Sequence, residues 1–137
     1  MDYYEWVAGQ LGKAPAVTQW KEIPSEDVSD PNLTTHAGTV RQTWVGDKVV
    51  LTRVVVKANS RGKPHFHPAE QVSMILRGGV RVTLGDAEQI ATAGSIVHIP
   101  GNAGHMFDIL GEETEILDVY MVGAGVDDLR KRYPSRA

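Results

Sequence analysis

Seven short runs of apolar and β-branched residues, each closed by Gly, Asn, Asp or Pro, dominate residues 39–122 of the sequence. No helical spacing of apolar residues appears among them. The expected strands are Thr39–Trp44, Val49–Lys57, Gln71–Leu76, Val80–Leu84, Ser95–Ile99, His105–Ile109 and Glu115–Val122. Strands at this spacing predict an all-β antiparallel sandwich or barrel.

The segments on either side of these runs have a different character. Residues 1–38 are expected to form an N-terminal helix over residues 2–11 and an irregular lead-in that packs on the barrel, with one edge strand near Trp20–Ile23. Residues 123–137 form a C-terminal segment, with a short helix over Val126–Tyr133. Because no linker or internal repeat is visible, we expect a single domain.

Composition excludes several classes of function. The chain has 137 residues, 42% hydrophobic and 23% charged, with a net charge of -3. A nucleic-acid partner is not expected, because binding phosphates needs a basic excess. Since no apolar stretch reaches the ~20 residues that span a bilayer and no secretory signal is visible, we expect a cytoplasmic protein without membrane contact. Cysteine is absent, so a metal must bind imidazole, carboxylate or amide groups.

Four of the five histidines lie between positions 65 and 105. Residues 65–67 are expected to begin a strand, so the imidazoles of His65 and His67 would point to one face, and Gln71 shares that face if the strand continues without a bulge. His105 opens a later strand after a turn. Three imidazoles and an amide oxygen suit one divalent ion of Mn, Fe, Ni, Co or Zn, and they leave positions open for a small-molecule substrate.

Other residues compete for these roles. Glu70 is the alternative fourth ligand, but it has the opposite strand parity, so Gln71 is favoured. His98 is expected to be a packed or interface residue. His36 receives no role.

Two motifs in this region resemble those of the cupin superfamily. Residues 65–78 read HFHPAEQVSMILRG, with a glutamine where the family has a glutamate ligand and with Gly78 at the expected spacing. Residues 94–105 read GSIVHIPGNAGH, with the glycine, proline and histidine in register. The resemblance implies a single cupin barrel, a double-stranded β-helix or jelly roll. It also implies a metal site made of His65, His67, Gln71 and His105.

Three positions depart from the family motifs. Asn59 and Asn102 stand where the motifs have glycine, and Ile109 stands where the second motif ends in asparagine. The first two are turn positions, and asparagine tolerates a positive φ there. We therefore expect the fold to be retained.

Other side chains are expected to point into the barrel. Counting by twos from Gln71 turns Ser73 and Ile75 inward, and counting from His105 turns Phe107 inward. Ser73 and Phe107 are the candidates for substrate contact. Asp118 and Tyr120 share one face of the last strand. A carboxylate in a mainly apolar barrel needs a partner or a reacting proton.

Asp118 is therefore a candidate general acid or base. An ion pair with Arg53 or Arg81 is the alternative. Tyr120 is a candidate hydrogen-bond donor to the substrate, and packing at the edge of the cavity is its alternative role.

Within the superfamily, the chain resembles small single-domain cupins of pectin degradation, which ketonise unsaturated uronates. Their last strand ends in D-V-F-x-x-x-R, and residues 118–124 here read DVYMVGA. Ala124 replaces the arginine that would grip the substrate carboxylate, and Arg130 is a possible substitute.

The resemblance implies a metal-dependent enzyme of isomerase or lyase type that moves a proton on an enolisable substrate. A dioxygenase that uses O₂, a polyketide cyclase and a non-enzymatic ligand-binding cupin are the alternatives. A homodimer is also expected, because small cupins usually dimerise and the aromatic N-terminal segment suits cross-packing.

Overall fold

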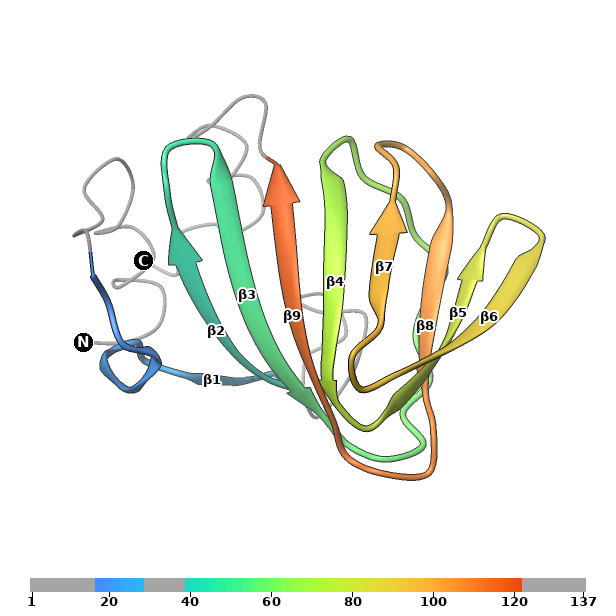
Figure 1. Ribbon diagram of the computed structural model, residues 1–137, viewed down its shortest axis with the longest axis horizontal. Helices are drawn as coiled ribbons and strands as arrows, with labels where there is room; N and C mark the ends of the chain where they lie inside the picture. The colour runs from blue at the N-terminus through green and yellow to red at the C-terminus, as the bar shows by residue number, and fades with distance from the viewer. Residues whose placement is uncertain (1–16, 29–38, 122–137) are drawn as a thin grey trace.

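The computed structural model describes residues 17–28 and 39–121. These residues form nine strands and one short 3-10 helix (Figure 1). In chain order the elements are η1 (Trp20–Glu22), β1 (Glu26–Val28), β2 (Thr39–Val45), β3 (Val49–Val56), β4 (Glu70–Arg77), β5 (Gly79–Leu84), β6 (Ala87–Thr92), β7 (Ile96–Ile99), β8 (His105–Ile109) and β9 (Thr114–Met121). The expected helices over residues 2–11 and Val126–Tyr133 lie outside the described residues.

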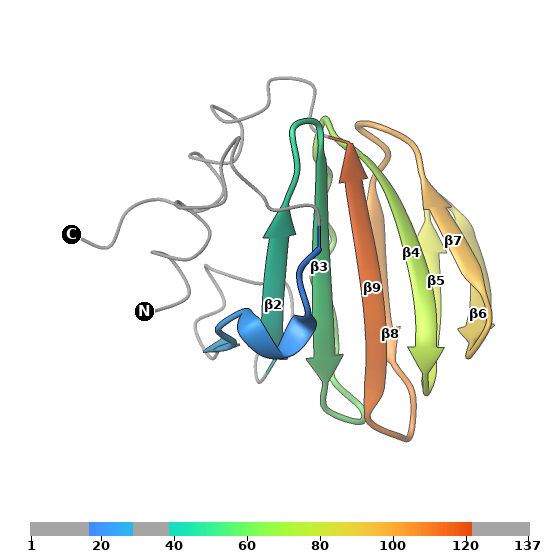
Figure 2. The ribbon, with the colours of Figure 1, turned by 60° about the vertical axis from the view of Figure 1, so that its left-hand side comes forward.

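The strands form two antiparallel sheets. The larger has the order β1-β2-β3-β9-β4-β7, and the smaller has the order β6-β5-β8. Figures 1 and 2 show the smaller sheet folded against the β4 and β7 end of the larger one. This arrangement confirms the predicted all-β jelly roll, in which strands distant in sequence, such as β3 and β9, lie side by side.

The inward-facing residues of β4 change from polar to apolar along the strand, so the space between the sheets has a polar part and an apolar part. Gln71, Ser73 and Ile75 are all buried on the inner face, as is Phe107 on β8, and these inward positions are as predicted. Across β9, Gln71 pairs with Tyr120, Ser73 with Asp118 and Ile75 with Ile116. The polar part therefore lies where β4 begins, at the top of Figure 1.

Below it lies the hydrophobic core. Its buried members come from both sheets: Val56, Ile75, Val80, Val82, Ala91, Ile99, Phe107, Ile109 and Ile116. Most are β-branched or aromatic, which suits a pleated sheet packed on one face. This core forms the floor beneath the polar side chains.

The predicted edge strand near Trp20–Ile23 is wrong. Trp20–Glu22 is a 3-10 helix, and the Gln42 side chain holds it by donating to the carbonyl oxygens of Trp20 (2.8 Å) and Ile23 (2.9 Å). The edge strand comes later, at β1, where Glu26–Val28 pairs with β2. A side chain from a distant strand decided this local structure, so neighbouring sequence did not reveal it.

Strand β6 was not predicted from the sequence. Ala87–Thr92 is rich in residues with low strand propensity, and it pairs with β5 alone in the described sheet. The hairpin turn at Gly85, with φ +58, is what joins it to β5. Tertiary pairing here outweighs the weak propensity of the segment.

The two asparagines at glycine positions behave as predicted. Asn59 has φ 61 and Asn102 has φ 63, both in the left-handed region. Asparagine accepts this conformation at lower cost than most residues. The turns are therefore kept despite the substitutions.

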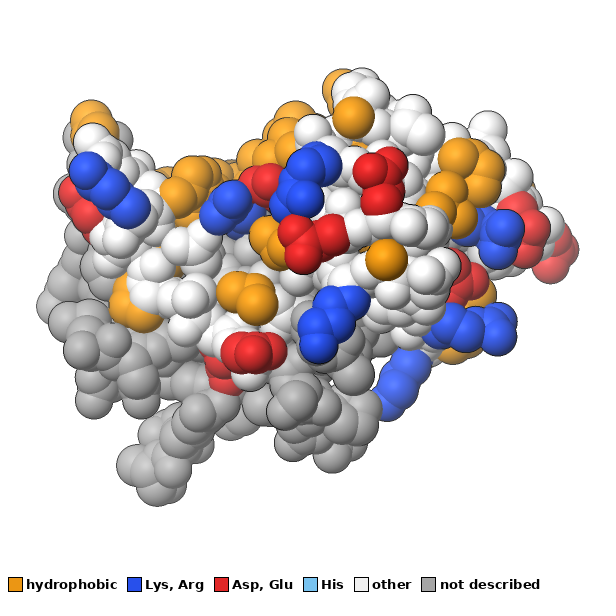
Figure 3. Space-filling model, turned by 90° about the horizontal axis from the view of Figure 1, so that it is seen from below, with side chains coloured by type: hydrophobic (Ala, Val, Ile, Leu, Met, Phe, Trp, Pro, Cys, Tyr) orange, Lys and Arg blue, Asp and Glu red, His pale blue; other side chains and the backbone are white. Residues whose placement is uncertain are grey.

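The end opposite the polar part carries mixed charges (Figure 3). Arg77 contacts Glu113 at 3.0 Å and Glu115 at 3.8 Å, and Arg53 contacts Glu115 at 2.7 Å. The Arg77–Glu113 pair is about half exposed, and pairs of this kind contribute little to stability. Across the part of the chain that the structure describes, no helix has the length and apolar character needed to cross a membrane.

Candidate metal centre

Three imidazoles lie together in the polar part of the barrel. The ring centroids of His65 and His105 are 4.2 Å apart, and those of His67 and His105 are 4.9 Å apart. One ligand nitrogen from each of the three histidines lies within 4.8 Å of the others. Backbone bonds join two of them directly, because His65 and His105 exchange N–H···O bonds of 3.0 and 2.9 Å. The three can form a metal site.

The prediction that His65 and His67 begin a continuous strand is wrong. His65 forms an isolated bridge, the chain bends at Pro68 and Ala69, and β4 starts at Glu70. A proline has no N–H to offer a ladder, which favours the break. Both imidazoles still reach the cluster, whereas Phe66 between them is 71% exposed.

Each imidazole is oriented by a backbone carbonyl two residues away. The pairs are His65 Nδ1 with Lys63 O (2.8 Å), His67 Nδ1 with Ala69 O (2.9 Å) and His105 Nδ1 with Ala103 O (2.8 Å). A carbonyl only accepts, so each Nδ1 carries the proton and donates. In the neutral ring each Nε2 therefore keeps its lone pair, which is the tautomer that a metal-binding histidine needs.

His105 is the most buried of the three histidines, and its Nε2 has no hydrogen-bond partner among the residues that the structure describes. A buried polar atom without a partner is costly unless something else binds it. Burial lowers the pKa of His105; the bond to the Ala103 carbonyl opposes this, and the nearby imidazoles of His65 and His67 lower it further. The neutral, ligating form is thus favoured, and the site fits a metal ion.

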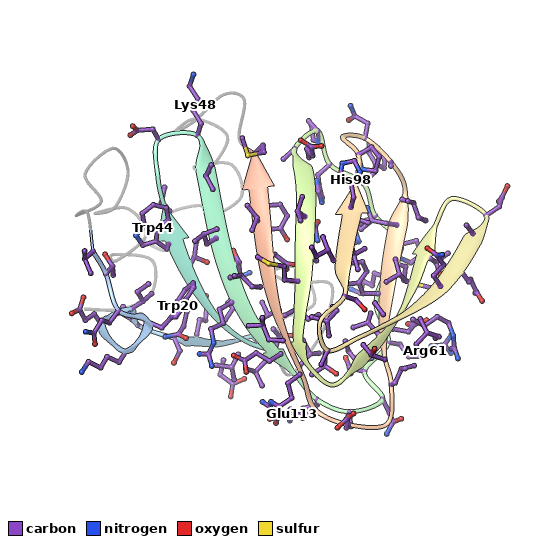
Figure 4. The ribbon with its side chains drawn as sticks, viewed as in Figure 1. Trp20, Trp44, Lys48, Arg61, His98 and Glu113 are labelled. Carbon is purple, nitrogen blue, oxygen red and sulfur yellow. The ribbon has the colours of Figure 1, made fainter. Side chains whose placement is uncertain are left out.

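Gln71 joins this cluster and Glu70 does not. Gln71 Oε1 lies 3.0 Å from His67 Nε2 inside the barrel. Glu70 lies on the outer face, where its Oε2 is 2.7 Å from His98 Nε2. Figure 4 labels His98 at the upper part of β7. Glu70 and Gln71 are neighbours in β4, so their side chains point to opposite faces of the sheet. Strand parity therefore separates these two candidates correctly, although it does not extend back to His65 and His67.

Asp118 lies in a hydrogen-bonded group beside Gln71. Its Oδ1 accepts from Ser73 Oγ at 2.5 Å and from Gln71 Nε2 at 3.3 Å. The Tyr120 hydroxyl donates to its Oδ2 at 3.4 Å. The sequence did not predict that Ser73 would link Asp118 to Gln71, because the pairing of β4 with β9 brings them together.

Arg53, the alternative partner of Asp118, is engaged elsewhere. Its guanidinium donates to Glu115 at 2.7 Å and to Gln42 at 2.8 Å. In the β3–β9 register Arg53 is opposite Leu117, one residue out of phase with Asp118. The two side chains therefore lie on opposite faces of the sheet.

Phe107 provides an apolar wall beside the imidazoles. Its ring centroid is 6.3 Å from that of His105, and the residue is buried. On the other side, Tyr120 lies 5.7 Å from the His67 ring. The site therefore combines converging nitrogen lone pairs, a carboxylate, a phenol and an apolar surface.

The turn before His105 supports the loop that carries His67. Asn102 N–H donates to His67 O at 2.8 Å, and a Cβ at Gly101 would lie 2.6 Å from Pro68 O. Neither contact has a sequence signature beyond the turn itself. The backbone carbonyls of Lys63, Ala69 and Ala103 had no signature either, because every residue has a carbonyl.

Replacing Gly101 by alanine is expected to displace Pro68 and destabilise the protein by about 1–3 kcal/mol, the usual cost of overpacking. Metal affinity should fall as well, because His67 is one residue from the displaced carbonyl. Urea denaturation and metal titration check both effects. Gly104→Ala is the control, since nothing lies within 4 Å of its added Cβ. If Gly101→Ala and Gly104→Ala had the same stability and metal affinity, the turn before His105 would not support the loop that carries His67.

The comparison with protein families decides the identity of the fold. The profile of the cupin domain family matches residues 52–120, just over half of the chain. The chain belongs to the cupin family. The comparison with curated protein sequences returns no match.

Solved cupin structures share this fold at low sequence identity. An RmlC-like cupin from Shewanella frigidimarina is 17% identical with a TM-score of 0.70, covering 82% of this chain and 96% of that one. KdgF from Halomonas sp. is 19% identical with a TM-score of 0.70, covering 85% and 99%. The polyketide cyclase RemF from Streptomyces resistomycificus is 22% identical with a TM-score of 0.66, covering 79% and 80%. These similarities establish the cupin barrel but no reaction.

Proposed function

We propose that this cupin is a metal-dependent enzyme that transfers a proton, as an isomerase or lyase does, on a small substrate with an enolisable carbonyl or a hydroxyl group. One observation carries the proposal: Asp118 is buried and accepts from Gln71 Nε2 at 3.3 Å, and the Oε1 of the same amide lies 3.0 Å from His67 Nε2 in the three-histidine cluster. A metal site and a nearby carboxylate are the two components that such a reaction needs.

Four side chains would hold the ion. His65, His67 and His105 would bind it through Nε2, and Gln71 through Oε1. The donor set suits Mn, Fe, Ni, Co or Zn. The bound ion would supply Lewis acidity toward a substrate oxygen. Phe107 would exclude water from one side and contact the apolar part of the substrate.

Asp118 would carry the proton. Its Oδ1 accepts from Ser73 and Gln71, so we assign the transfer to Oδ2, on the side of Tyr120. The carboxylate takes a proton from a substrate carbon, and the electron pair of that C–H bond moves toward the substrate oxygen. Delivery of a proton from the carboxyl group to another carbon completes an isomerisation without any oxidant. Exchange of that proton with solvent before delivery would bring deuterium into the substrate in D₂O. When substrate binds, the Tyr120 hydroxyl would turn its single O–H from Asp118 Oδ2 to the substrate.

Two substrate classes fit the proposed reaction. The resemblance to uronate-ketonising cupins and the similarity in fold to KdgF support a sugar acid. The alanine at position 124 removes the expected carboxylate-binding arginine, and this position lies outside the described residues. The similarity in fold to RemF makes an aromatic polyketide the second class to test.

Metal-loaded protein in D₂O is expected to exchange carbon-bound hydrogen of at least one compound in a panel of unsaturated uronates, 2-keto acids and 1,3-diketones. NMR measures the exchange, and an oxygen electrode should record no O₂ uptake. At saturating metal, Asp118→Asn should lower the rate at least about a hundredfold, within the usual contribution of general acid–base catalysis.

The same assays can refute the proposal. O₂ consumed in proportion to product would show a dioxygenase instead. Absence of exchange across the panel with metal bound would favour a ligand-binding cupin. An Asp118→Asn protein with full activity would remove Asp118 from the mechanism.

A further inference from the structure

The side-chain amide of Gln71 lies between the Ser73–Asp118 pair and the imidazole of His67. On one side its Nε2 is 2.8 Å from Ser73 Oγ and 3.3 Å from Asp118 Oδ1. On the other side its Oε1 is 3.0 Å from His67 Nε2. Gln71, Ser73 and Asp118 are all buried. A buried polar group that lacks a hydrogen bond cannot bond to water instead, so the partners in this group determine how the Gln71 amide is oriented.

The bonding partners fix which end of the amide faces the histidines. An ionised carboxylate only accepts, so the group facing Asp118 must be the NH₂ of Gln71. Ser73 donates its hydroxyl proton to Asp118 and accepts from Gln71 with a lone pair. Gln71 Oε1 therefore faces His67 Nε2, which is itself an acceptor when its Nδ1 donates to Ala69. Two acceptors 3.0 Å apart are the arrangement expected of two ligands to one cation.

We infer that Asp118 and Ser73 are positioning residues that select glutamine, and disfavour glutamate, as the fourth metal ligand. With glutamate at position 71, a carboxylate oxygen would occupy the place of Nε2, 3.3 Å from Asp118 Oδ1. Two carboxylates at that distance repel unless one is protonated. Glutamine avoids the repulsion and donates a hydrogen bond instead.

This pairing also accounts for the charge of the site. Three neutral imidazoles and an amide bring no negative charge to a divalent ion. Asp118 supplies one beyond Gln71, in the low-dielectric interior where charges interact strongly. The departure of this chain from the glutamate of the family motif is thus explained by a residue 47 positions away. The inference rests on the proposed metal site and is independent of the proposed reaction.

A double-mutant cycle tests the pairing. Co²⁺ affinity is measured by competition with a chelator for the wild type, Gln71→Glu, Asp118→Asn and the double variant. Gln71→Glu is expected to weaken binding at least tenfold, although glutamate is the more negative ligand. In the double variant the new asparagine amide can donate to the new glutamate carboxylate, so affinity should recover at least tenfold relative to Gln71→Glu alone.

Two further measurements separate positioning from a general loss of structure. Ser73→Ala should weaken Co²⁺ binding about 10–100-fold, as loss of a partner behind a ligand usually does. The control Ser95→Ala removes a hydroxyl that accepts from Thr92 N–H at an exposed turn, and it should leave affinity unchanged. The visible spectrum of bound Co²⁺ should change in Gln71→Glu and return toward the wild-type spectrum in the double variant. Circular dichroism of the metal-free proteins should be the same throughout.

The outcomes distinguish this inference from the proposed function. If Gln71→Glu binds Co²⁺ as tightly as the wild type, or if Asp118→Asn does not improve Gln71→Glu, the pairing is refuted while the metal site stands. If the wild type binds no Co²⁺, the metal site, the inference and the proposed enzyme all fail together.

Discussion

Replacing His105 by alanine is expected to weaken divalent-metal binding at least about a hundredfold, beyond the 10–100-fold typical of residues behind a ligand. His105 Nε2 is buried and has no hydrogen-bond partner within residues 17–28 and 39–121, so we expect a bound ion to be its partner. The backbone bonds between residues 65 and 105 do not depend on the side chain, so the loop should keep its place. Competition titration with a chelator measures the loss.

His98→Ala is the matched control for this variant. His98 lies on the outer face and contacts Glu70 at 2.7 Å, with more than half of its side chain exposed. Its removal should leave metal affinity within a factor of two. If His98→Ala lost as much affinity as His105→Ala, the metal would not be bound by the inner cluster.

Replacing Ile75 by alanine is expected to destabilise the metal-free protein by about 2–5 kcal/mol, the range for removing a buried branched side chain. Ile75 is 1% exposed and pairs with Ile116 at the floor of the site. The packed core around it has little freedom to close the cavity. Urea denaturation of metal-free protein gives the change without a contribution from metal binding.

Ile90→Ala serves as the control, because Ile90 is 56% exposed on β6. Its loss should change the free energy of unfolding by no more than about 0.5 kcal/mol. If Ile75→Ala and Ile90→Ala lowered the free energy of unfolding by similar amounts, the core would not lie where β4 and β9 meet.

Local periodicity accounts for what the sequence predicted well. Seven strands were anticipated because apolar runs and turn residues recur at strand spacing, and parity then turned Ser73, Ile75 and Phe107 inward. The histidine cluster was anticipated because spacing and motif agree. Asn59 and Asn102 show that turn chemistry, too, can be inferred from residue type.

Two of the three missed features depend on contacts between distant segments. The 3-10 helix at Trp20–Glu22 is held by Gln42, and β6 exists because β5 pairs with it. The break after His67 was overlooked because strand parity was extended through Pro68. The first two cases follow from partners that no local window contains, whereas the break could have been inferred from Pro68 itself.

In the candidate site, too, some features follow from local sequence and others from contacts between distant segments. Residue types identified His65, His67, His105 and Gln71, but not what orients them. The three backbone carbonyls and the link from Ser73 to Asp118 appear only when the strands are placed side by side. Those partners determine the tautomers and the amide orientation, and so they determine what the site can bind.

Titration of the metal-free wild-type protein with Co²⁺ tests the central claim most directly. We predict saturation at one ion per chain, with a visible spectrum typical of nitrogen and oxygen ligands and with displacement by Zn²⁺. Absence of saturable binding, or saturation that is unchanged in a protein lacking the side chains of His65, His67 and His105, would contradict the account.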